Sequence, residues 1–303
     1  MIIVGNKSSV YIDPQAKIGE NVKIYPGTII EGNVVIEDNC FLGPNTFIQG
    51  DEIIIKKNNI FKCDVSIFHK VFIDEGNIFF KGACIGEISQ HLRSSGDKSK
   101  VIIGKNNLIR EFVTINRGTD SDKKKTVIKN NTLIMAYAHI AHDCLIEDEV
   151  IISNSVQLAG HVTVEKGAVI GGLSGIHQFV RIGKYTMIGG ASAVERDIPH
   201  FCLAKGNRAY LEGINIIGLK RRNFNKETIK ALLNAYEIIF GNKKDKKKTI
   251  NESLSIVLEK YGHILEVKEF VEFIKNSKRG CTLPKKYNDK NNDRKGKKRR
   301  YKI

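Results

Sequence analysis

The sequence predicts an all-β solenoid of six-residue repeats followed by a C-terminal α-helical domain, and three patterns support this fold class. An aliphatic residue falls at every sixth position between residues 128 and 194. The fourth residue after it is small or β-branched in most hexads. Three apolar stripes at helical spacing follow Pro199. A helix repeats near 3.6 residues and a simple strand near two, so a period of six indicates flat walls made from stacked coils.

The repeat starts at Ile12 and predicts a solenoid domain over residues 1–198. Aliphatic residues recur every six positions until the count slips by one before Ile55. This slip predicts a bulge or a tighter corner within the same fold. Residues 87–100 and 117–126 carry no hexad pattern. We expect both to leave the solenoid as loops, where repeat proteins commonly place binding residues, although a solvated insertion without a role is the alternative.

Residues 199–280 predict a helical domain that covers one end of the solenoid. The first apolar stripe follows Asn225, a favourable N-cap. The second follows Thr249 and Glu252, which have the spacing of a capping box. The third covers residues 267–274. An open end of a solenoid exposes unpaired backbone groups, and packed helices are one way to cover it.

The chain is strongly basic, with 49 Lys and Arg against 33 Asp and Glu. The last twenty residues hold ten Lys or Arg against two Asp. Residues 281–303 therefore predict a basic tail that is disordered. The alternative is a docking surface for an acidic protein, a nucleic acid or an anionic membrane. We rank nucleic acid lowest and expect no such partner, because the basic residues do not alternate with aromatic ones in a nucleic-acid-binding pattern.

No run of 18 apolar residues and no secretory leader pattern is present. We therefore expect a soluble cytoplasmic protein with no integral membrane segment. The six cysteines form no CxxC pair. Cys40 and Cys144 occupy the small inward position of their hexads, so we interpret them as reduced core residues without disulfide or metal function.

Four of the eight histidines, His139, His142, His161 and His177, lie in the most regular part of the repeat. If three walls of six residues make one coil, Gly160 and His161 lie one strand spacing, about 4.8 Å, from His142. None of the four occupies an inward position. The cluster is compatible with a zinc site, with a general base and its binding set, or with a surface ladder of no consequence.

Four motifs carry a family resemblance: AHIAHDC at 138–144, LAGHV at 158–162, GIHQF at 175–179 and NIIGLKRRNF at 215–224. In this order they resemble the UDP-N-acetylglucosamine O-acyltransferases that begin lipid A synthesis. The resemblance implies a left-handed parallel β-helix and a homotrimer with active sites between subunits. It also implies transfer of a 3-hydroxyacyl chain from acyl carrier protein to the glucosamine 3-position of UDP-GlcNAc, with neither a metal nor an organic cofactor.

The resemblance assigns the catalytic roles to three residues. His142 would be the general base, because imidazole is neutral near pH 7 and takes a proton from a hydroxyl. Asp143 would orient its ring, and the backbone N–H of Gly160 would stabilise the oxyanion. Gly190 matches the acyl-chain ruler of the family. A missing side chain there leaves a long groove, which favours a long acyl chain.

The substrate-binding residues implied by the resemblance are Gln90, Arg93, His139, His161, His177, Gln178, Asn215, Arg221 and Arg222. His91, Asn116 and Ile217 depart from the common family pattern, which shows an acid, a histidine and a glutamate at these positions. The departures leave open an enzyme that forms an amide on a 3-amino UDP-sugar. A zinc-dependent hydratase and a coenzyme-A-dependent acetyltransferase on the same scaffold are the competing hypotheses.

Overall fold

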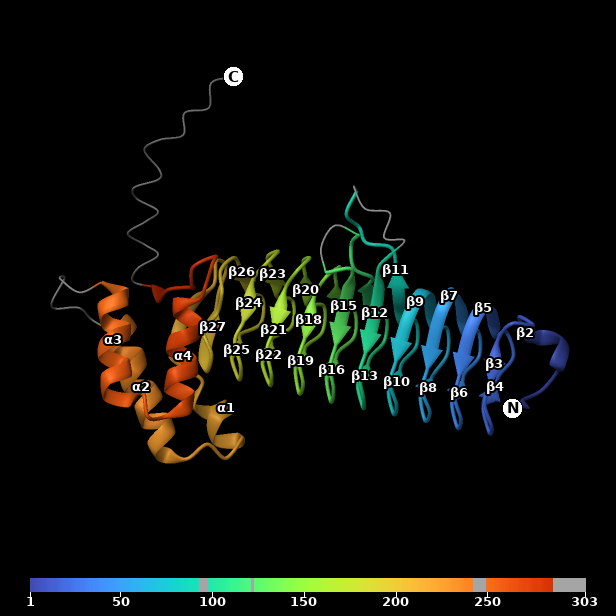
Figure 1. Cartoon of the computed structure of the whole chain (residues 1–303), viewed down its shortest axis with the longest axis horizontal. Coiled ribbons are helices and arrows are strands. Elements are labelled where there is room, and N and C mark those ends of the chain that lie inside the picture. Colours follow the sequence, from blue (N-terminus) through green and yellow to red (C-terminus); the bar gives the residue numbers. More distant parts are fainter. Residues whose placement is uncertain (93–97, 121–122, 242–248, 286–303) are drawn as a thin grey trace, which may run out of the picture.

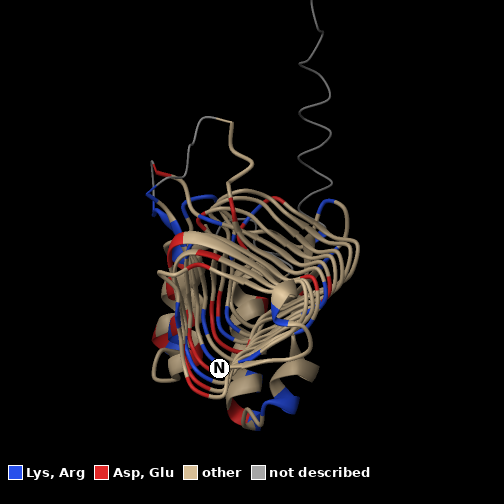
Figure 2. Ribbon diagram, turned by 90° about the vertical axis from the view of Figure 1, so that its right-hand side faces the viewer, with Lys and Arg blue, Asp and Glu red and all other residues tan. Residues whose placement is uncertain are grey.

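The computed structural model of the chain describes residues 1–92, 98–120, 123–241 and 249–285. They form a long prism of stacked three-sided coils, with a helical region at the C-terminal end (Figure 1). Viewed along its long axis, the solenoid shows its coils one behind another, with acidic and basic residues in columns (Figure 2). The period of six therefore correctly predicted the solenoid, and the apolar stripes after Pro199 correctly predicted the helical region behind it.

The first wall is a twelve-stranded sheet, parallel except for its last strand, which is antiparallel. In spatial order it contains β1 (Ile2–Ile3), β4 (Lys23–Ile24), β6 (Phe41–Leu42), β8 (Ile60–Phe61), β10 (Ile78–Phe79), β13 (Leu108–Ile109), β16 (Leu133–Ile134), β19 (Ile151–Ile152), β22 (Val169–Ile170), β25 (Met187–Ile188), β27 (Cys202–Lys205) and β28 (Tyr210–Ile214).

The other two walls belong to one sixteen-stranded sheet that folds around an edge of the prism. The second wall contains β2 (Tyr11–Ile12), β11 (Cys84–Glu87), β14 (Thr114–Asn116), β17 (His139–Ile140), β20 (Gln157–Leu158), β23 (Gly175–Ile176) and β26 (Ala193–Val194). The third contains β3 (Lys17–Ile18), β12 (Lys100–Ile103), β15 (Lys125–Ile128), β18 (Leu145–Ile146), β21 (Thr163–Val164) and β24 (Arg181–Ile182). Three long strands run through both walls: β5 (Ile29–Ile36), β7 (Phe47–Ile55) and β9 (Ser66–Ile73).

The hexad aliphatics form the core of the prism. From residue 128 to residue 194 all twelve are at most 2% exposed. Each fully buried Ile or Leu contributes about 1.5–3 kcal/mol of transfer free energy. Neighbouring strands of the second wall pair eighteen residues apart, as His139 does with Gln157. The repeat therefore fixes the coil length, and the coil length fixes which outward side chains lie above one another.

Two predicted irregularities of the solenoid are present. The one-residue slip is a bulge in β7, where the register shifts between Gln49 and Glu52. Two segments lie between the second and third walls, and their described parts, residues 88–92 with 98–99 and residues 117–120 with 123–124, project from the same side of the solenoid (Figure 1). They leave the edge around which β5, β7 and β9 bend. We call this edge, between the second and third walls, the loop edge.

The helical region consists of α1 (Ile216–Arg221), α2 (Lys226–Phe240), α3 (Ile250–Tyr261) and α4 (Leu265–Lys275). At the other end of the chain, a single 3-10 turn spans Lys7–Ser9. Asn225 caps α2, and Thr249 and Glu252 form the predicted capping box of α3. The six-residue helix α1 has no apolar stripe and was not predicted. No helix of the described residues is long and apolar enough to cross a membrane.

The sheet extends beyond Val194, the last hexad residue. Strand β27 pairs in parallel with β25, and β28 then pairs with β27. Residues 199–214, which we expected to belong to the helical domain, therefore complete the first wall. Residues 281–284 of the expected tail also pair with the fold through bridges to Asp197 and Leu211. The remainder of the tail, beyond residue 285, lies outside the described residues.

A buried polar cluster joins the last coils to α4. His200 is 6% exposed, and its Nδ1 accepts a hydrogen bond from the backbone N–H of Lys184 at 2.8 Å. Its ring packs against Phe273 of α4, with 4.6 Å between the ring centroids. Glu165 approaches His200 Nδ1 to 3.4 Å and pairs with Arg181 at 2.8 Å. Burial, aided by the charges of Lys184 and Arg181, lowers the pKa of His200 from 6.5 to about 3.

This cluster makes the stability of the fold dependent on pH. Below pH 6.5 the unfolded chain protonates His200 while the folded chain does not, so stability falls with pH until about pH 3. We expect the wild type to lose about 2 kcal/mol more than His200→Gln between pH 7 and pH 5. Urea unfolding at both pH values measures this difference. Equal losses in the two proteins would contradict a neutral, buried His200. Burial raises the pKa of Glu165, so the contribution of Glu165 to stability increases as the pH falls. Both proteins contain Glu165, so this contribution does not enter the difference between them.

Candidate active site

His142 lies at a corner of the loop edge, directly against the next coil. Residues 141–144 connect β17 to β18, and residues 159–162 connect β20 to β21. The backbone N–H of His161 donates to the carbonyl of His142 at 3.0 Å. His142 is only 7% exposed, because the neighbouring coil covers it. The stacking that the coil length predicted for these residues is therefore present.

His142 and Asp143 form a hydrogen-bonded dyad. Nδ1 of His142 lies 3.0 Å from Oδ2 of Asp143, whose side chain is fully buried. Thr119, from the second projecting loop, donates to the same oxygen through its hydroxyl at 2.7 Å and its backbone N–H at 3.1 Å. Burial alone would raise the pKa of Asp143, but the hydrogen bonds from His142 and Thr119 outweigh it and lower that pKa. An ionised Asp143 holds the proton of His142 on Nδ1 and leaves Nε2 with its lone pair.

His161 packs against this dyad from the next coil. Its ring meets that of His142 edge to face, with 4.9 Å between centroids, and stacks on Phe179 at 4.4 Å. Its Nε2 lies 3.9 Å from Asp143 Oδ2. Ligand atoms of His142, Asp143 and His161 lie within 4.8 Å of one another, so these residues can be considered for a metal. The two hydrogen bonds from Thr119 and the one from His142 already occupy Oδ2 of Asp143, which fits a catalytic dyad better than an open metal site.

Gly160 provides the space in which the ring of His142 lies. A Cβ atom at residue 160 would lie 2.3 Å from Cε1 and 2.5 Å from Nε2 of His142, far inside van der Waals contact. No described residue accepts a hydrogen bond from the backbone N–H of Gly160. A backbone donor therefore remains available beside the imidazole, as an oxyanion site requires.

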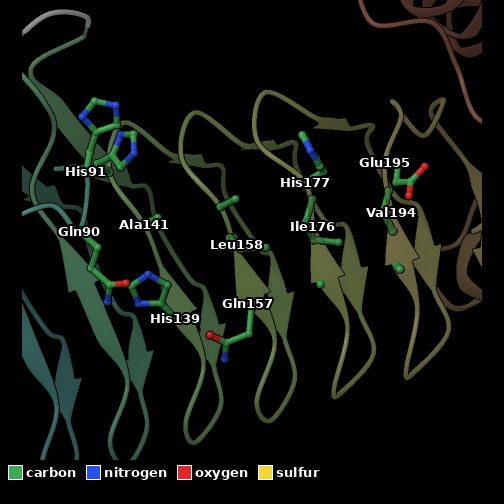
Figure 3. Close-up of a pocket in the computed structure, with 14 residues that line it drawn as sticks. Gln90, His91, His139, Ala141, Gln157, Leu158, Ile176, His177, Val194 and Glu195 are labelled. Carbon is green, nitrogen blue, oxygen red and sulfur yellow. The ribbon is translucent and has the colours of Figure 1, made fainter. Parts of the chain in front are cut away.

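A groove of about 600 Å³ runs from this corner along the second wall (Figure 3). His139 stands on the wall, half-buried, with its Nδ1 2.7 Å from the hydroxyl of Thr114. Burial lowers the pKa of His139, and the nearby His142 adds to this effect, so His139 is neutral at pH 7. The groove is lined by Gln90, His91, His139, Ala141, His142, Gln157, Leu158, Ala159, Gly175, Ile176, His177, Ala193, Val194 and Glu195.

The first projecting loop contributes Gln90 and His91 to this groove. The rings of His91 and His142 meet edge to face, with 5.7 Å between their centroids. His91 thus lies beside His142, the predicted base. Arg93 lies outside the described residues. Asn116 is buried at the end of β14 and donates to the carbonyl of Glu87, so it lies between the loop and the wall.

Three predicted binding residues lie at another edge of the prism. Asn215 caps α1 and donates to the carbonyl of Tyr185 at 3.0 Å. Arg222 pairs with Glu149 at 2.9 Å and lies over the ring of Tyr185. These contacts belong to the edge between the third and first walls. Arg221, the last residue of α1, is exposed at the same edge. Within one chain they do not join the groove. Ile217, also on α1, is 67% exposed.

Gly190 lies at the remaining edge, between the first and second walls. A Cβ atom there would approach the carbonyl oxygen of Gly172 to 3.2 Å, and residue 190 is exposed. It does not line the groove of the single chain. Gln178 follows His177 at the loop edge and is half-buried.

Sequence reasoning missed Thr119, Gln157 and Glu195. Thr119 is separated from Asp143 by 24 residues and a loop of irregular length, so no coil spacing could place it. Gln157 could have been found, because it lies one full coil beyond His139 on the outward face of the second wall. Glu195 likewise lies one coil beyond His177 in the sequence.

The chain is similar to known proteins over most of its length. A family model described as Udp N-acetylglucosamine O-acyltransferase, Domain 2, matches residues 197–282, and a model of bacterial transferase hexapeptide repeats matches residues 15–50 and 125–160. The acyl-(acyl-carrier-protein)–UDP-N-acetylglucosamine O-acyltransferase of Aliarcobacter butzleri is 42% identical over 87% of this chain and 99% of its own length. The like-named protein of Campylobacter concisus is 38% identical over 86% of this chain and 98% of its own.

Solved structures show the same likeness. The UDP-N-acetylglucosamine acyltransferase of Francisella novicida superposes with a TM-score of 0.81 at 31% identity and covers 95% of this chain and 96% of its own. That of Bacteroides fragilis has a TM-score of 0.75 at 38% identity and covers 91% of this chain and 99% of its own. With its hexapeptide solenoid, helical region and histidine corner, the chain belongs to the UDP-N-acetylglucosamine O-acyltransferase family.

Proposed function

We propose that this protein moves a 3-hydroxyacyl chain from acyl carrier protein to the 3-hydroxyl of the glucosamine in UDP-GlcNAc, the first step of lipid A biosynthesis. The observation that carries the proposal is the dyad of His142 and Asp143 beside the backbone N–H of Gly160. A base, its orienting acid and an oxyanion donor are the three groups that acyl transfer from a thioester to a hydroxyl needs. We also propose that the enzyme acts in the cytoplasm.

His142 would begin the reaction through Nε2, which faces away from Asp143. It takes the proton of the sugar hydroxyl while the oxygen attacks the thioester carbonyl, so a C–O bond forms and the carbonyl oxygen becomes an oxyanion. The backbone N–H of Gly160 donates to that oxyanion. The C–S bond then breaks, and His142 returns the proton to the departing thiolate. Asp143 stabilises the imidazolium formed in between and stays ionised, because its pKa is lowered.

We propose a homotrimer because one chain holds only part of the expected binding set. His139, His177 and Gln90 line the groove, whereas Arg221 and Arg222 lie at a different edge of the prism. Packing the loop edge of one copy beside the edge between the third and first walls of another would bring the two groups together. Guanidinium groups suit phosphate oxygens, so Arg221 and Arg222 would meet the diphosphate or the carrier protein. The groove along the second wall would hold the acyl chain, with Gly190 of an adjoining copy at its end.

The position of His91 favours a second candidate acceptor, a 3-amino UDP-sugar. The ring centroid of His91 lies 5.7 Å from that of His142, at a position where the family resemblance implies an acid. An imidazole can accept a hydrogen bond from an amine as well as donate one to a hydroxyl. The product would then be an amide, formed by the same base and the same oxyanion donor.

Acyl transfer can be tested by incubating the protein with 3-hydroxyacyl carrier proteins of several chain lengths and equal amounts of UDP-GlcNAc and its 3-amino analogue. We expect the mass of the product to match the acylated UDP-GlcNAc ester, at a rate that a zinc chelator does not change. An amide product would establish the second acceptor instead. A chelator-sensitive hydration without acyl transfer would favour the zinc hydratase, and no product from any donor would refute the proposal.

A further inference from the structure

The segment that follows α4 returns to the loop edge at Asp197 and continues to the first wall at Leu211. We call residues 277–284 the strap. The backbone N–H of Asp197 donates to the carbonyl of Gly280 at 3.2 Å, and that of Thr282 donates to the carbonyl of Asp197 at 2.8 Å. The hydroxyl of Ser277 donates to the carboxylate of Asp197 at 2.7 Å. Asp197 is 1% exposed, so these bonds fix the strap to a rigid part of the last coil.

The strap places the guanidinium of Arg279 against a groove residue. Its Nε donates to the carbonyl of Glu195 at 3.1 Å, and its Nη2 lies 3.0 Å from Nδ1 of His177. His177 and Glu195 both line the groove from its C-terminal end (Figure 3). Arg279 does not line the groove itself, so it acts on a bound molecule through the two groove residues that it contacts. Of these contacts, the one with His177 is to a side chain that can change its hydrogen-bonding role.

A guanidinium can only donate hydrogen bonds, and this decides the tautomer of His177. When Arg279 donates to Nδ1, that nitrogen carries a lone pair, so the proton of the neutral ring is on Nε2. A second contact competes with this arrangement: Nδ1 also lies 3.1 Å from the carbonyl of Gln178, and it would have to carry the proton to bind that oxygen. Nδ1 cannot make both hydrogen bonds, because one needs its lone pair and the other needs a proton on it. The donor of Arg279 favours the form in which Nδ1 has the lone pair.

We propose that Arg279 is a positioning residue that keeps His177 in the tautomer with its proton on Nε2. His177 then presents a donor to an oxygen of the substrate in the groove, and without Arg279 the ring can turn its proton toward Gln178 and present an acceptor. The inference rests on the proposed function, because it takes His177 to contact substrate. It adds a residue of the helical region to a site otherwise built by the solenoid.

Steady-state kinetics of Arg279→Ala and Arg279→Gln, each in the wild-type and His177→Ala backgrounds, test this role. We expect Arg279→Ala to lower kcat/KM by about three- to tenfold, which is the usual effect of losing one neutral hydrogen bond, here the one from Nε2 of His177 to the substrate. Arg279→Gln keeps an N–H donor without the charge and should recover most of the loss. In the His177→Ala background neither variant should matter, because residues that act together are not additive. Lys278→Ala removes a charge from a neighbouring residue of the same strap and is the matched control.

Equal losses from Arg279→Ala in both backgrounds, or no recovery with Arg279→Gln, would overturn the proposal in favour of a charge or a structural role. The tautomer is also measured directly by long-range proton–nitrogen spectra of protein labelled with 15N-histidine, with His177→Ala as the assignment. We expect an unprotonated Nδ1 in the wild type and a changed pattern in Arg279→Ala. An unchanged pattern would refute the inference. If the wild type transfers no acyl group, the proposed function fails, and the spectra still decide the role of Arg279.

Discussion

Replacing His142 by alanine is expected to lower kcat/KM of acyl transfer by about 10²–10⁴-fold, the usual contribution of a positioned general base. The variant removes Nε2, which alone in the dyad has a lone pair facing the groove, and it leaves Asp143 bonded to Thr119. The oxyanion donor at Gly160 stays in place and accounts for residual turnover. Product formation under substrate-limiting conditions measures the loss.

The control for this variant is His263→Ala, which removes an exposed imidazole before α4. It should keep wild-type activity, and both variants should keep the molecular mass of the wild-type assembly in solution. Asp143→Asn should lower the rate as well, because an amide can hold the ring of His142 in the wrong tautomer. Near-normal turnover by His142→Ala would remove it from the role of base.

Gly160→Ala is expected to reduce activity by about 10²-fold or more, roughly as much as losing the base, although only one methyl group is added. The new Cβ would lie 2.3 Å from Cε1 of His142, so the ring must leave its position over the backbone N–H of residue 160. The reason is space and not backbone strain, since Gly160 is not among the residues with positive φ. A crystal structure of the variant would show the displaced ring, and initial rates give the loss.

The double variant separates this effect from general damage to the fold. In the His142→Ala background the ring is gone, and the methyl group added by Gly160→Ala fits in the vacated space. Gly160→Ala should therefore cost little further activity there and leave the melting temperature near that of His142→Ala. A large additional loss of stability in the double variant would mean that the methyl group disturbs the coil itself, and would contradict a direct clash with His142.

The six-residue repeat predicts those contacts of the site that arise from the stacking of one coil on the next. Because the coil is eighteen residues long, the contacts of His142 with Gly160 and His161 follow from counting alone. The caps of α2 and α3 were predictable for a similar reason, since they depend on side chains within a few residues of the helix start.

Contacts that cross irregular segments could not be predicted. Thr119 reaches Asp143 from a projecting loop, and β27 joins the first wall after a turn that interrupts the hexads. The strap binds residues 80 positions earlier in the chain, as Ser277 does with Asp197. The roles of Arg221 and Arg222 depend on how copies of the chain pack, which no spacing within one chain determines.

The return of the strap to the last coil has a consequence for biosynthesis. A solenoid folds by adding coils to those already formed, and a chain emerges from the ribosome N-terminus first at about 5–20 residues per second. The corner of His142 can therefore be stacked early in translation, whereas His177 meets Arg279 only after a further 102 residues have been made and α2 to α4 have folded back. A nascent chain thus contains its dyad seconds before Arg279 can reach His177.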